Sequence, residues 1–401
     1  MRRTCLDALS VVPAAALAAA VHSAGDYGSG LPDDPAPTIA ALVHGHVSAA
    51  AHAQPFMGLT SILLRLPFAA LASALGGGRM LTYRLGVFAC ALVLAAVVLA
   101  VVCRARPRPV VGLLIAVVAV LNPITVEWLN GHPEELLGGA LCAGAVLAAM
   151  DDRPVLAGVL LGLAIGTKEW ALLAALPTAV ACSRGRCRML LIAAVVAAPL
   201  VLTMPAMDPT AFARVSRGLG ALTWPSIRSW WWTVSGYRHV KLAHGLSASV
   251  HLLPLGLTRA DVSMLPLLVA APLAWLHVRR QPRPQDAMRL LALALLLRCT
   301  LDPECGPYYT IPAIVALLAW EGLDGRISLA ALIGTAFFSL GEHEASAATT
   351  LGTAQLCWLA GTVGLTAYLL HDELRVLTAA RRRLIAPVVR TYRERRPEWA
   401  D

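Results

Sequence analysis

Two adjacent aspartates, Asp33 and Asp34, stand in the stretch GLPDDPAPTIAALVHGH, between two apolar regions of the chain. One carboxylate of such a pair can accept a proton from an attacking hydroxyl while the other orients it or raises its basicity. The alternative is structural: Asp34 would cap a short amphipathic helix over 36–51, with Pro35 in the first position. Asp26, in GDYGSG, is a weaker third candidate for the base. Both interpretations of the pair stay open.

A second polar stretch, VEWLNGHPEELLGG, carries His132 and Glu135 three residues apart. This spacing predicts that both side chains share one face of a helix that begins near Pro133, whose ring suits a first helical turn. The order His-Pro-Glu-Glu matches no metal-binding signature, so we expect substrate binding here. The alternative is a polar helix start whose acids favour the positive end of the helix dipole.

Lys168, in GTKEW, follows a long apolar stretch at a depth where a charge costs at least ~3 kcal/mol and by default marks function. Because adjacent helical residues point to different faces, Glu169 is a poor partner for this lysine. We therefore expect Lys168 to take an anion from elsewhere, such as a lipid phosphate. Snorkelling of the ammonium group to the outer head groups is the alternative.

The segment LRCTLDPECGPYYTIP places Asp302 two residues before Glu304 and adds the aromatic pair Tyr308 and Tyr309. Two acids separated by one residue could bind a divalent cation through oxygen ligands, although one such pair is a weak signal. Tyrosines at an interface are usually belt residues, although we expect these two to bind substrate. Trp231, in WPSIRSWWWTVSGYRHVK, could stack on a sugar or anchor the loop at the bilayer interface, and anchoring is favoured for most of the tryptophans.

The composition determines what must position these residues. Of the 401 residues, 58% are hydrophobic and 14% are charged, whereas about a quarter are charged in soluble domains. Because the bilayer core satisfies no backbone group and the apolar runs do not alternate, the spans must be helices. The net charge of +9 comes in short Arg-rich clusters between apolar runs, which is typical of cytoplasmic loops and not of a nucleic-acid interface. Nine cysteines without paired spacing predict neither a disulfide framework nor a zinc site.

These runs predict an all-α polytopic transmembrane helix bundle of about twelve spans, with 11 to 13 allowed. Residues 155–182 are too few for two full spans and too many for one, so we expect two short helices that meet at GTKEW. The expected spans are Leu6–Ala24, Leu81–Cys103, Val110–Val126, Glu135–Met150, Val155–Gly166, Trp170–Cys182, Met189–Met204, Val262–Val278, Met288–Cys299, Tyr309–Trp320, Ile327–Leu340 and Leu351–Leu370.

The basic clusters fix the orientation of this bundle. Residues 57–78 are apolar enough to cross but carry Arg65 and Pro67 near their middle. If they form a span, the clusters RARPR, SRGRCR and RRQPR lie outside the cell; if they form an interfacial or re-entrant helix, all three lie inside with both termini. The positive-inside rule favours the second arrangement. We therefore expect a multi-pass plasma-membrane protein whose acids and histidines lie mostly on the extracytoplasmic side.

This topology divides the chain into a transmembrane domain at 1–372 and a basic cytoplasmic tail at 373–401. Within the domain, residues 25–80 are expected to form the first extracytoplasmic loop, with interfacial helices. Residues 205–261 form a second extracytoplasmic loop. Any chemistry is therefore expected on the outer face.

An acidic first loop, interfacial helices and many short spans resemble the GT-C superfamily of polytopic membrane glycosyltransferases. The strings DDPAP, QPFMGLTSILLRLPF, NGHPEELLGGALCAGAVLAA, AGVLLGLAIGTKEWALLAALP and LRCTLDPECGPYYTIPAIVALLAWE are similar to segments of actinobacterial membrane proteins. Those proteins are related to the polyprenyl-phosphate-mannose-dependent mannosyltransferases, and the resemblance covers residues 33–321. It implies that a sugar, mannose by this likeness, moves from a polyprenyl-phosphate donor to a glycolipid or glycan acceptor of the cell envelope.

The resemblance also implies a first-loop carboxylate as the base, and the matching position is Asp33 or Asp34. The leaving phosphate departs as a stable anion, so a cation such as Lys168 is enough to offset its charge. No cofactor is certain, and a divalent cation stays open. The partners are the two substrates and membrane lipids, without nucleic acid. The residues expected to bind substrate are His132, Glu135, Lys168, Asp302, Tyr308, Tyr309 and Trp231.

Two other functions fit a polytopic membrane protein. A transporter or lipid flippase would show paired halves and ionisable groups near the midplane, and the sequence has no half-to-half similarity. A non-catalytic subunit of an envelope-assembly complex would use its outer polar residues only to contact partners.

Overall fold

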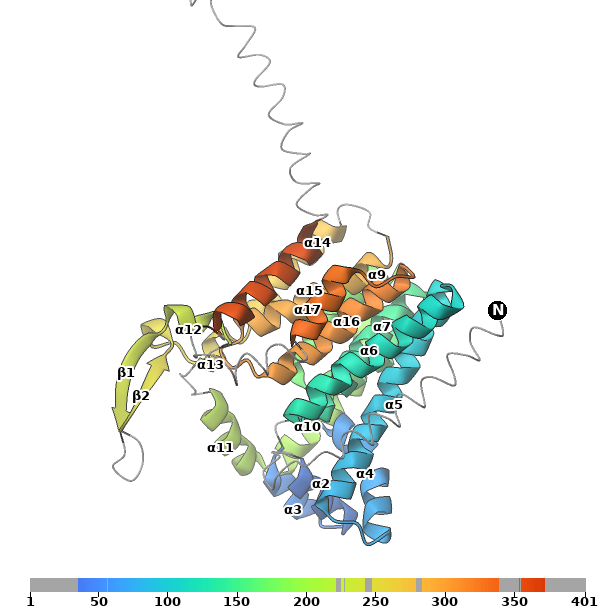
Figure 1. The fold of residues 1–401 in the computed structure, drawn as a ribbon. Coiled ribbons are helices and arrows are strands. Elements are labelled where there is room, and N and C mark those ends of the chain that lie inside the picture. Colours follow the sequence, from blue (N-terminus) through green and yellow to red (C-terminus); the bar gives the residue numbers. More distant parts are fainter. Residues whose placement is uncertain are drawn as a thin grey trace, which may run out of the picture.

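The computed structural model describes residues 35–55, 57–220, 225–226, 228–241, 247–278, 283–338, 353 and 355–371. These residues form a bundle of helices from which a two-stranded hairpin projects (Figure 1). The α-helices are α2 (Ala36–Val43), α3 (Val47–Ala53), α4 (Leu59–Ala74), α5 (Arg79–Ala105), α6 (Pro109–Asn130), α7 (Pro133–Met150), α8 (Pro154–Ile165), α9 (Ala175–Ala181), α10 (Arg186–Met207), α11 (Pro209–Gly220), α12 (Trp231–Val234), α13 (Arg259–Val262), α14 (Leu265–Val278), α15 (Asp286–Leu301), α16 (Thr310–Leu323) and α17 (Leu329–Ala336). The 3-10 helices are η1 (Glu169–Ala174), η3 (Pro254–Gly256) and η4 (Pro307–Tyr309).

Among the described residues, five helical segments are long and apolar enough to cross a bilayer: Arg79–Ala105, Pro109–Val126, Pro133–Met150, Arg186–Met207 and Arg259–Leu276. The segments Leu59–Ala74, Pro154–Ile165 and Glu169–Ala181 are apolar but shorter. The predicted all-α, membrane-like bundle is therefore confirmed, whereas the count of about twelve spans stays a prediction. The first predicted span, Leu6–Ala24, lies outside the described residues.

Helix α7 lies in the centre of the bundle and packs against α5, α8 and α16. Its side chains are apolar and small nearly all round, as a helix enclosed on every side requires, and Pro133 to Ala149 are all buried. Two glycines near its start allow other segments to approach the helix closely. A Cβ on Gly138 would lie 2.9 Å from the Trp170 ring, and one on Gly139 would lie 2.9 Å from Cα of Pro312. The first turn of α7 is thereby held against η1 and α16.

The chain between α8 and α9 is broken at GTKEW, which confirms the prediction of two short helical segments meeting there. Helix α8 ends at Ile165, Lys168 is extended (φ −153°, ψ 146°), and η1 leads into α9. The break is joined to the segment before α4 by two backbone hydrogen bonds, from Gly58 N to Thr167 O (2.9 Å) and from Thr60 N to Gly166 O (3.0 Å). Lys168 therefore lies in a fixed irregular connection.

Helix α8 packs closely on α10 through glycines at every fourth position, Gly158, Gly162 and Gly166. A Cβ on Gly158 or Gly162 would lie 2.5 or 2.7 Å from a backbone oxygen of α10. Small residues spaced by four let the backbones of two membrane helices approach. This contact sets the position of the GTKEW break, which follows directly.

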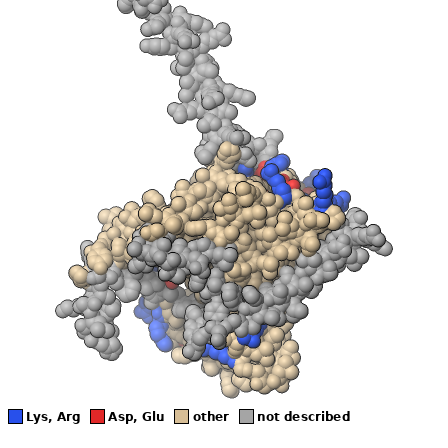
Figure 2. Space-filling view, viewed as in Figure 1, with Lys and Arg blue, Asp and Glu red and all other residues tan. Residues whose placement is uncertain are grey.

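Two basic clusters of the helix connections, RARPR and SRGRCR, lie together at one end of the bundle. Arg104 pairs with Asp151, and Ser183 donates to the neighbouring Asp152, so the RARPR and SRGRCR segments are close. Gln285, at the start of α15, donates to Asp324 at 2.8 Å. Figure 2 shows charged side chains towards two opposite edges of the visible face, with a broad described band nearly without them between. This distribution is typical of a membrane-spanning bundle.

Residues 36–53 form two short helices and not the single helix predicted over 36–51. The chain turns at Gly45 (φ +75°), which separates α2 from α3. Pro35, predicted in the first helical position, takes the N-cap position of α2, and capping by Asp34 stays a prediction. Asp33 and Asp34 themselves lie outside the described residues.

Helix α4 carries Arg65 and Pro67, and both of its ends lie at the end of the bundle away from the basic clusters. It starts beside the GTKEW break and packs along the first turns of α5. The Arg65 side chain is buried against Gly86, where a Cβ would lie 2.6 Å from Arg65 Nε. The chain turns back into α5 without crossing the bundle, as the second topology requires; the interfacial position of α4 stays a prediction.

The segment between α10 and α14 adds structure that the sequence interpretation did not include. Helix α11 is followed by α12 and by an antiparallel hairpin, β1 (Gly236–Lys241) and β2 (Ser247–Leu252), in which Gly236 pairs with Leu252. Asp208 caps α11 through Ala211 N at 2.8 Å. Its other carboxylate oxygen lies 2.8 Å from His52 Nδ1, which attaches α3 to the end of α10.

Candidate active site

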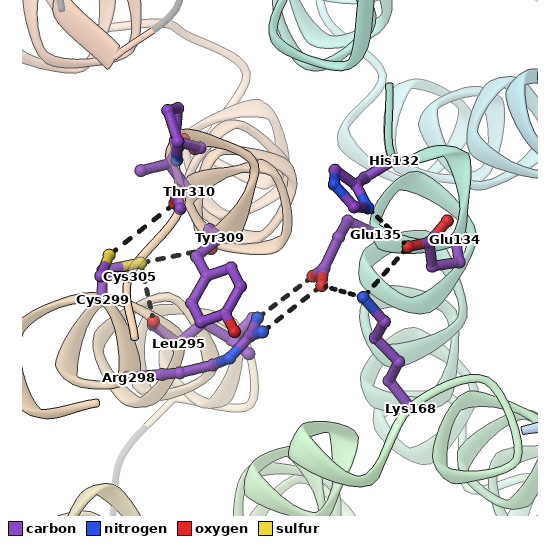
Figure 3. Close-up of polar contacts among 12 residues, drawn as sticks. His132, Glu134, Glu135, Lys168, Leu295, Arg298, Cys299, Cys305, Tyr309 and Thr310 are labelled. Carbon is purple, nitrogen blue, oxygen red and sulfur yellow. Dashed lines mark hydrogen bonds and ion pairs between the residues drawn. The ribbon is translucent and has the colours of Figure 1, made fainter. Parts of the chain in front are cut away.

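Four connections meet at the end of the bundle opposite the basic clusters: the start of α7, the GTKEW break, the end of α15, and η4. They bring together five of the predicted residues: His132, Glu135, Lys168, Tyr308 and Tyr309. Figure 3 shows Lys168 and Arg298 approaching Glu135 from opposite sides, Lys168 from the GTKEW break and Arg298 from α15. The site thus depends on residues far apart in the sequence.

Glu135 is the link between the two cations. Its side chain is fully buried, and Oε1 lies 3.1 Å from Lys168 Nζ. The Arg298 guanidinium donates to both of its oxygens, at 3.1 Å to Oε2 and 3.3 Å to Oε1. A buried carboxylate is stable only when such partners satisfy it. Glu135 does not line the cavity described below, so it positions the cations and does not contact a ligand there.

Glu134 completes the pairing around Lys168. Its Oε1 lies 3.0 Å from Lys168 Nζ and 2.9 Å from His132 Nδ1. Lys168 thus takes its anions from elsewhere than Glu169, as expected: two carboxylates from the first turn of α7 hold it, and a lipid phosphate as its partner stays a prediction. Since an ionised carboxylate only accepts hydrogen bonds, His132 donates through Nδ1 and keeps Nε2 for another partner. The His132 ring stacks on Tyr308, with 3.6 Å between centroids.

Arg298 lies between two aromatic rings. Its guanidinium carbon lies 3.8 Å from the centroid of Tyr309 and 4.7 Å from that of Trp170. Stacking on aromatic faces satisfies the parts of a buried guanidinium that form no ion pair. The position of Arg298 is thus fixed by one carboxylate and two rings.

Arg259, at the start of α13, forms a second ion cluster next to the first. It pairs with Glu304, its Nε lies 3.9 Å from Asp302 Oδ1, and its Nη2 lies 3.4 Å from the Tyr309 hydroxyl. The two acids considered for a divalent cation thus face a guanidinium. Within the described part of the chain, no group of three or more His, Cys, Asp or Glu side chains is arranged to hold a metal ion.

Trp231 supports the end of α15 and does not line the cavity. Its indole Nε1 donates to Leu301 O at 2.7 Å, and Ser229 Oγ donates to Asp302 O at 2.7 Å. These bonds hold the loop of Asp302 in place. Trp231 is therefore a positioning residue here.

A cavity of about 580 Å³ opens beside the two ion clusters. Three cations, Lys168, Arg259 and Arg298, and three acids, Glu169, Asp302 and Glu304, contribute to its lining, so its formal charge is balanced. Leu200, Val201 and Met204 of α10 and Phe212 and Val215 of α11 form an apolar wall. The outer face of α10 is also apolar and exposed, with Leu191, Val195 and Leu202 at 64%, 65% and 58% exposure. The cavity therefore joins a polar end to a surface suited to hydrocarbon.

Burial and charge shift the pKa values at this site. Burial raises the pKa of Asp302 and raises that of the Tyr308 hydroxyl to about 12. Burial alone would lower the pKa of Lys168, but the carboxylates of Glu134 and Glu135 outweigh it and raise that pKa well above its usual value. Tyr308 is therefore a neutral hydroxyl and Lys168 a fixed cation at neutral pH.

Sequence reasoning missed several residues of this site. Arg298 and Arg259 follow or precede apolar runs, and an arginine at such a boundary is a signal that could have identified them. Glu134 adjoins the predicted Glu135, and Glu169 adjoins Lys168, yet the contact of both Glu134 and Glu135 with Lys168 depends on packing. The predicted bases, Asp33 and Asp34, lie outside the described residues.

Comparison with known proteins agrees with this geometry. The family model of glycosyltransferase family 87, a family of GT-C-type membrane glycosyltransferases, matches residues 58–302, well over half of the chain. A comparison with curated proteins gave no match. The matched range contains the whole of the GTKEW break, the first turn of α7, Arg259, Arg298 and Asp302. The chain therefore belongs to glycosyltransferase family 87 and is a membrane glycosyltransferase of the GT-C type.

Proposed function

We propose that the enzyme transfers a hexose, mannose by its resemblance, from a polyprenyl-phosphate donor to a glycolipid or glycan of the cell envelope. The observation that supports this most is the cavity, which combines three cations and three acids at its polar end with an apolar wall that continues onto the exposed face of α10. A lipid phosphate has two complementary parts: an anion, which the cations can bind, and a hydrocarbon chain, which suits the apolar wall. A soluble nucleotide sugar would gain nothing from the apolar wall.

The chemistry divides between the loop and the bundle. Asp33 or Asp34 takes the proton from the acceptor hydroxyl as its oxygen bonds to the anomeric carbon of the donor sugar. The bond from that carbon to the phosphate oxygen breaks, and the lipid phosphate leaves with the electron pair. Lys168 and Arg259, which line the cavity, offset the charge of the leaving phosphate. A β-linked donor gives an α-linked product, because attack comes from the opposite face.

The basic clusters indicate which end of the bundle faces the cytoplasm. We propose that their end faces the cytoplasm and that the site faces the extracytoplasmic side of the plasma membrane, with both termini inside. Membership of a glycosyltransferase family disfavours the transporter and scaffold alternatives.

The test is sugar transfer by the purified protein in lipid. Radiolabelled polyprenyl-phosphate-mannose is supplied with an envelope lipid extract, and wild type is compared with Asp33→Asn, Asp34→Asn and the double variant. Asp152→Asn, at the basic end, is the matched control. We expect the double variant and one single variant to lose transfer by 10²-fold or more, as for removal of a general base, while the control keeps it. Full transfer by the double variant would contradict the assignment of the base to Asp33 or Asp34. If wild type transfers no sugar from this donor, the proposed donor is wrong.

A further inference from the structure

A second, smaller cavity lies next to the first. It has a volume of about 280 Å³ and lies between η1 and the start of α14. The two cavities share six lining residues: Glu169, Trp170, Leu172, Arg259, Arg298 and Asp302. The two cavities therefore meet at the polar side chains of the site. Two cavities that hold two substrates close together would have this arrangement.

The linings differ away from this boundary. His132 and Lys168 line only the larger cavity, together with the apolar wall of α10 and α11. Ser263, Met264 and Leu267 line only the smaller one. These residues belong to the start of the candidate span Arg259–Leu276. The smaller cavity thus has its own chemistry, mostly apolar with a polar edge.

Glu169 is the carboxylate at the boundary that has capacity for a ligand. It is exposed and lines both cavities. Asp302 accepts a hydrogen bond from Glu304 N at 3.0 Å, and Glu304 pairs with Arg259. No hydrogen bond or ion pair joins the Glu169 carboxylate to any residue that the structure describes. Its two oxygens can therefore accept hydrogen bonds from hydroxyl groups.

We propose that the smaller cavity is the acceptor site of the transferase and that Glu169 binds a hydroxyl of the acceptor head group. This inference rests on the proposed function, which assigns the larger cavity to the donor. Glu169 only accepts a hydrogen bond, and no bond breaks or forms on it. The shared Arg259 and Asp302 then lie where the donor and the acceptor meet.

The surroundings of the smaller cavity indicate an acceptor carried by a membrane lipid. Met264 is 55% exposed at its edge, and Leu268, one turn further along the span, is 64% exposed. A hydrocarbon chain attached to a head group in the cavity would continue along this face. The volume is slightly below the ~300 Å³ at which pockets for drug-sized ligands begin, so it suits a head group and not a long glycan.

The first test uses a matched pair of serines, one for each cavity. Ser263→Trp fills the smaller cavity, and Ser216→Trp fills the larger one, since each serine lines only that cavity. The probes are polyprenyl-phosphate-mannose as donor and octyl α-mannoside as acceptor. We expect Ser263→Trp to raise the acceptor KM about tenfold or more and to change the donor KM less than about twofold, and Ser216→Trp to do the reverse. Two variants that raise the same KM would overturn the assignment.

The second test concerns Glu169 itself. Glu169→Gln should raise the acceptor KM by roughly tenfold, because a hydrogen bond to a charged group weakens, and should leave the donor KM unchanged. Asp152→Asn, at the basic end of the bundle, is the control, since Asp152 lines neither cavity. An unchanged acceptor KM in Glu169→Gln would overturn its role. If methyl α-mannoside serves with the same kcat/KM as octyl α-mannoside, the lipid-linked class of acceptor is wrong.

A binding measurement separates this inference from the proposed function. Wild-type protein is irradiated with a photoreactive octyl α-mannoside, and the labelled peptide is identified by mass spectrometry. Labelling at residues 263–267 supports the acceptor site even if no sugar moves, in which case only the donor assignment fails. Labelling at α10 or α11 instead would overturn the acceptor site, whatever the turnover.

Discussion

At the scale of single residues, the site depends on Glu135. Its carboxylate has no exposed surface and holds Lys168 and Arg298 on opposite sides. A buried ion pair adds little to stability when it is complete, but the loss of one partner leaves an uncompensated charge in the interior. The single negative charge of Glu135 thus fixes two positive ones at the cavity.

We predict that Glu135→Gln keeps the volume of the side chain but destabilises the protein by about 3–5 kcal/mol. The measurement is the thermal midpoint in detergent, which should fall by roughly 5 °C or more. Glu304→Gln is the control, because its side chain is 41% exposed and such a pair is worth about 0–1 kcal/mol. Equal midpoints for the two variants would contradict a central role for Glu135.

At the scale of elements, the contact between α8 and α10 positions Lys168. Gly158, Gly162 and Gly166 allow the two backbones to touch, and the GTKEW break follows the last of them. The break in turn carries Lys168 and Glu169. A change in the spacing of these helices would therefore move a cation and a carboxylate together.

We predict that Gly162→Ala lowers both stability and the rate of transfer, because its Cβ would lie 2.7 Å from Ala193 O. Gly144→Ala is the matched control: this glycine is also buried within a helix, but its Cβ would meet only side chains at 3.4 and 3.5 Å, which are ordinary contacts. The measurements are the thermal midpoint and the transfer rate. If both alanine variants behave like wild type, the close α8–α10 contact does not position Lys168.

The elements were more predictable from the sequence than their contacts. Proline in the first turn marked the start of α7, and the polar GTKEW stretch marked a break. The single helix over 36–51 was wrong because Gly45 adopts a left-handed backbone conformation that the apolar pattern does not reveal. The hairpin was missed because its strands are only six residues long and the first, GYRHVK, has no apolar alternation, although the second, SASVHL, does.

The site was predictable in its residue types and not in its pairs. His132, Lys168, Asp302 and the two tyrosines were identified because polar residues between apolar runs are costly unless they have a role. The partners of Lys168 lie 33 and 34 residues away, and Arg298 lies 163 residues from Glu135. Such distances in the chain are closed only by packing, which single-sequence patterns do not encode.

At the scale of the whole molecule, the bundle has two chemically different ends. One carries the basic clusters, and the other carries the cavities. Between them lies the apolar band visible in Figure 2. The direction in which this bundle is inserted decides which compartment the substrates must reach.

Cysteine labelling can determine this direction. Cys187, in the SRGRCR cluster, is exposed, and so is His46 at the opposite end. We predict that a membrane-impermeant maleimide labels Cys187 only after the membrane is opened, and that it labels His46→Cys in intact cells, measured in a Cys187→Ser background. Labelling of Cys187 in intact cells would show that the bundle is inserted in the opposite direction.

The segment from Gln54 to Thr60 has a consequence for how relatives of this enzyme can vary. Gln54 donates to Met204 O at 2.8 Å, and the chain a few residues further on is bonded to the backbone beside Lys168. The end of the first loop is thus attached to the bundle at two points, a fixed number of residues apart, and the second point lies beside Lys168. Insertions and deletions should be tolerated around Gly45, where nothing lies within 4 Å of an added Cβ, but not between these two anchor points. Length polymorphism across the family would then be confined to the distal part of the loop.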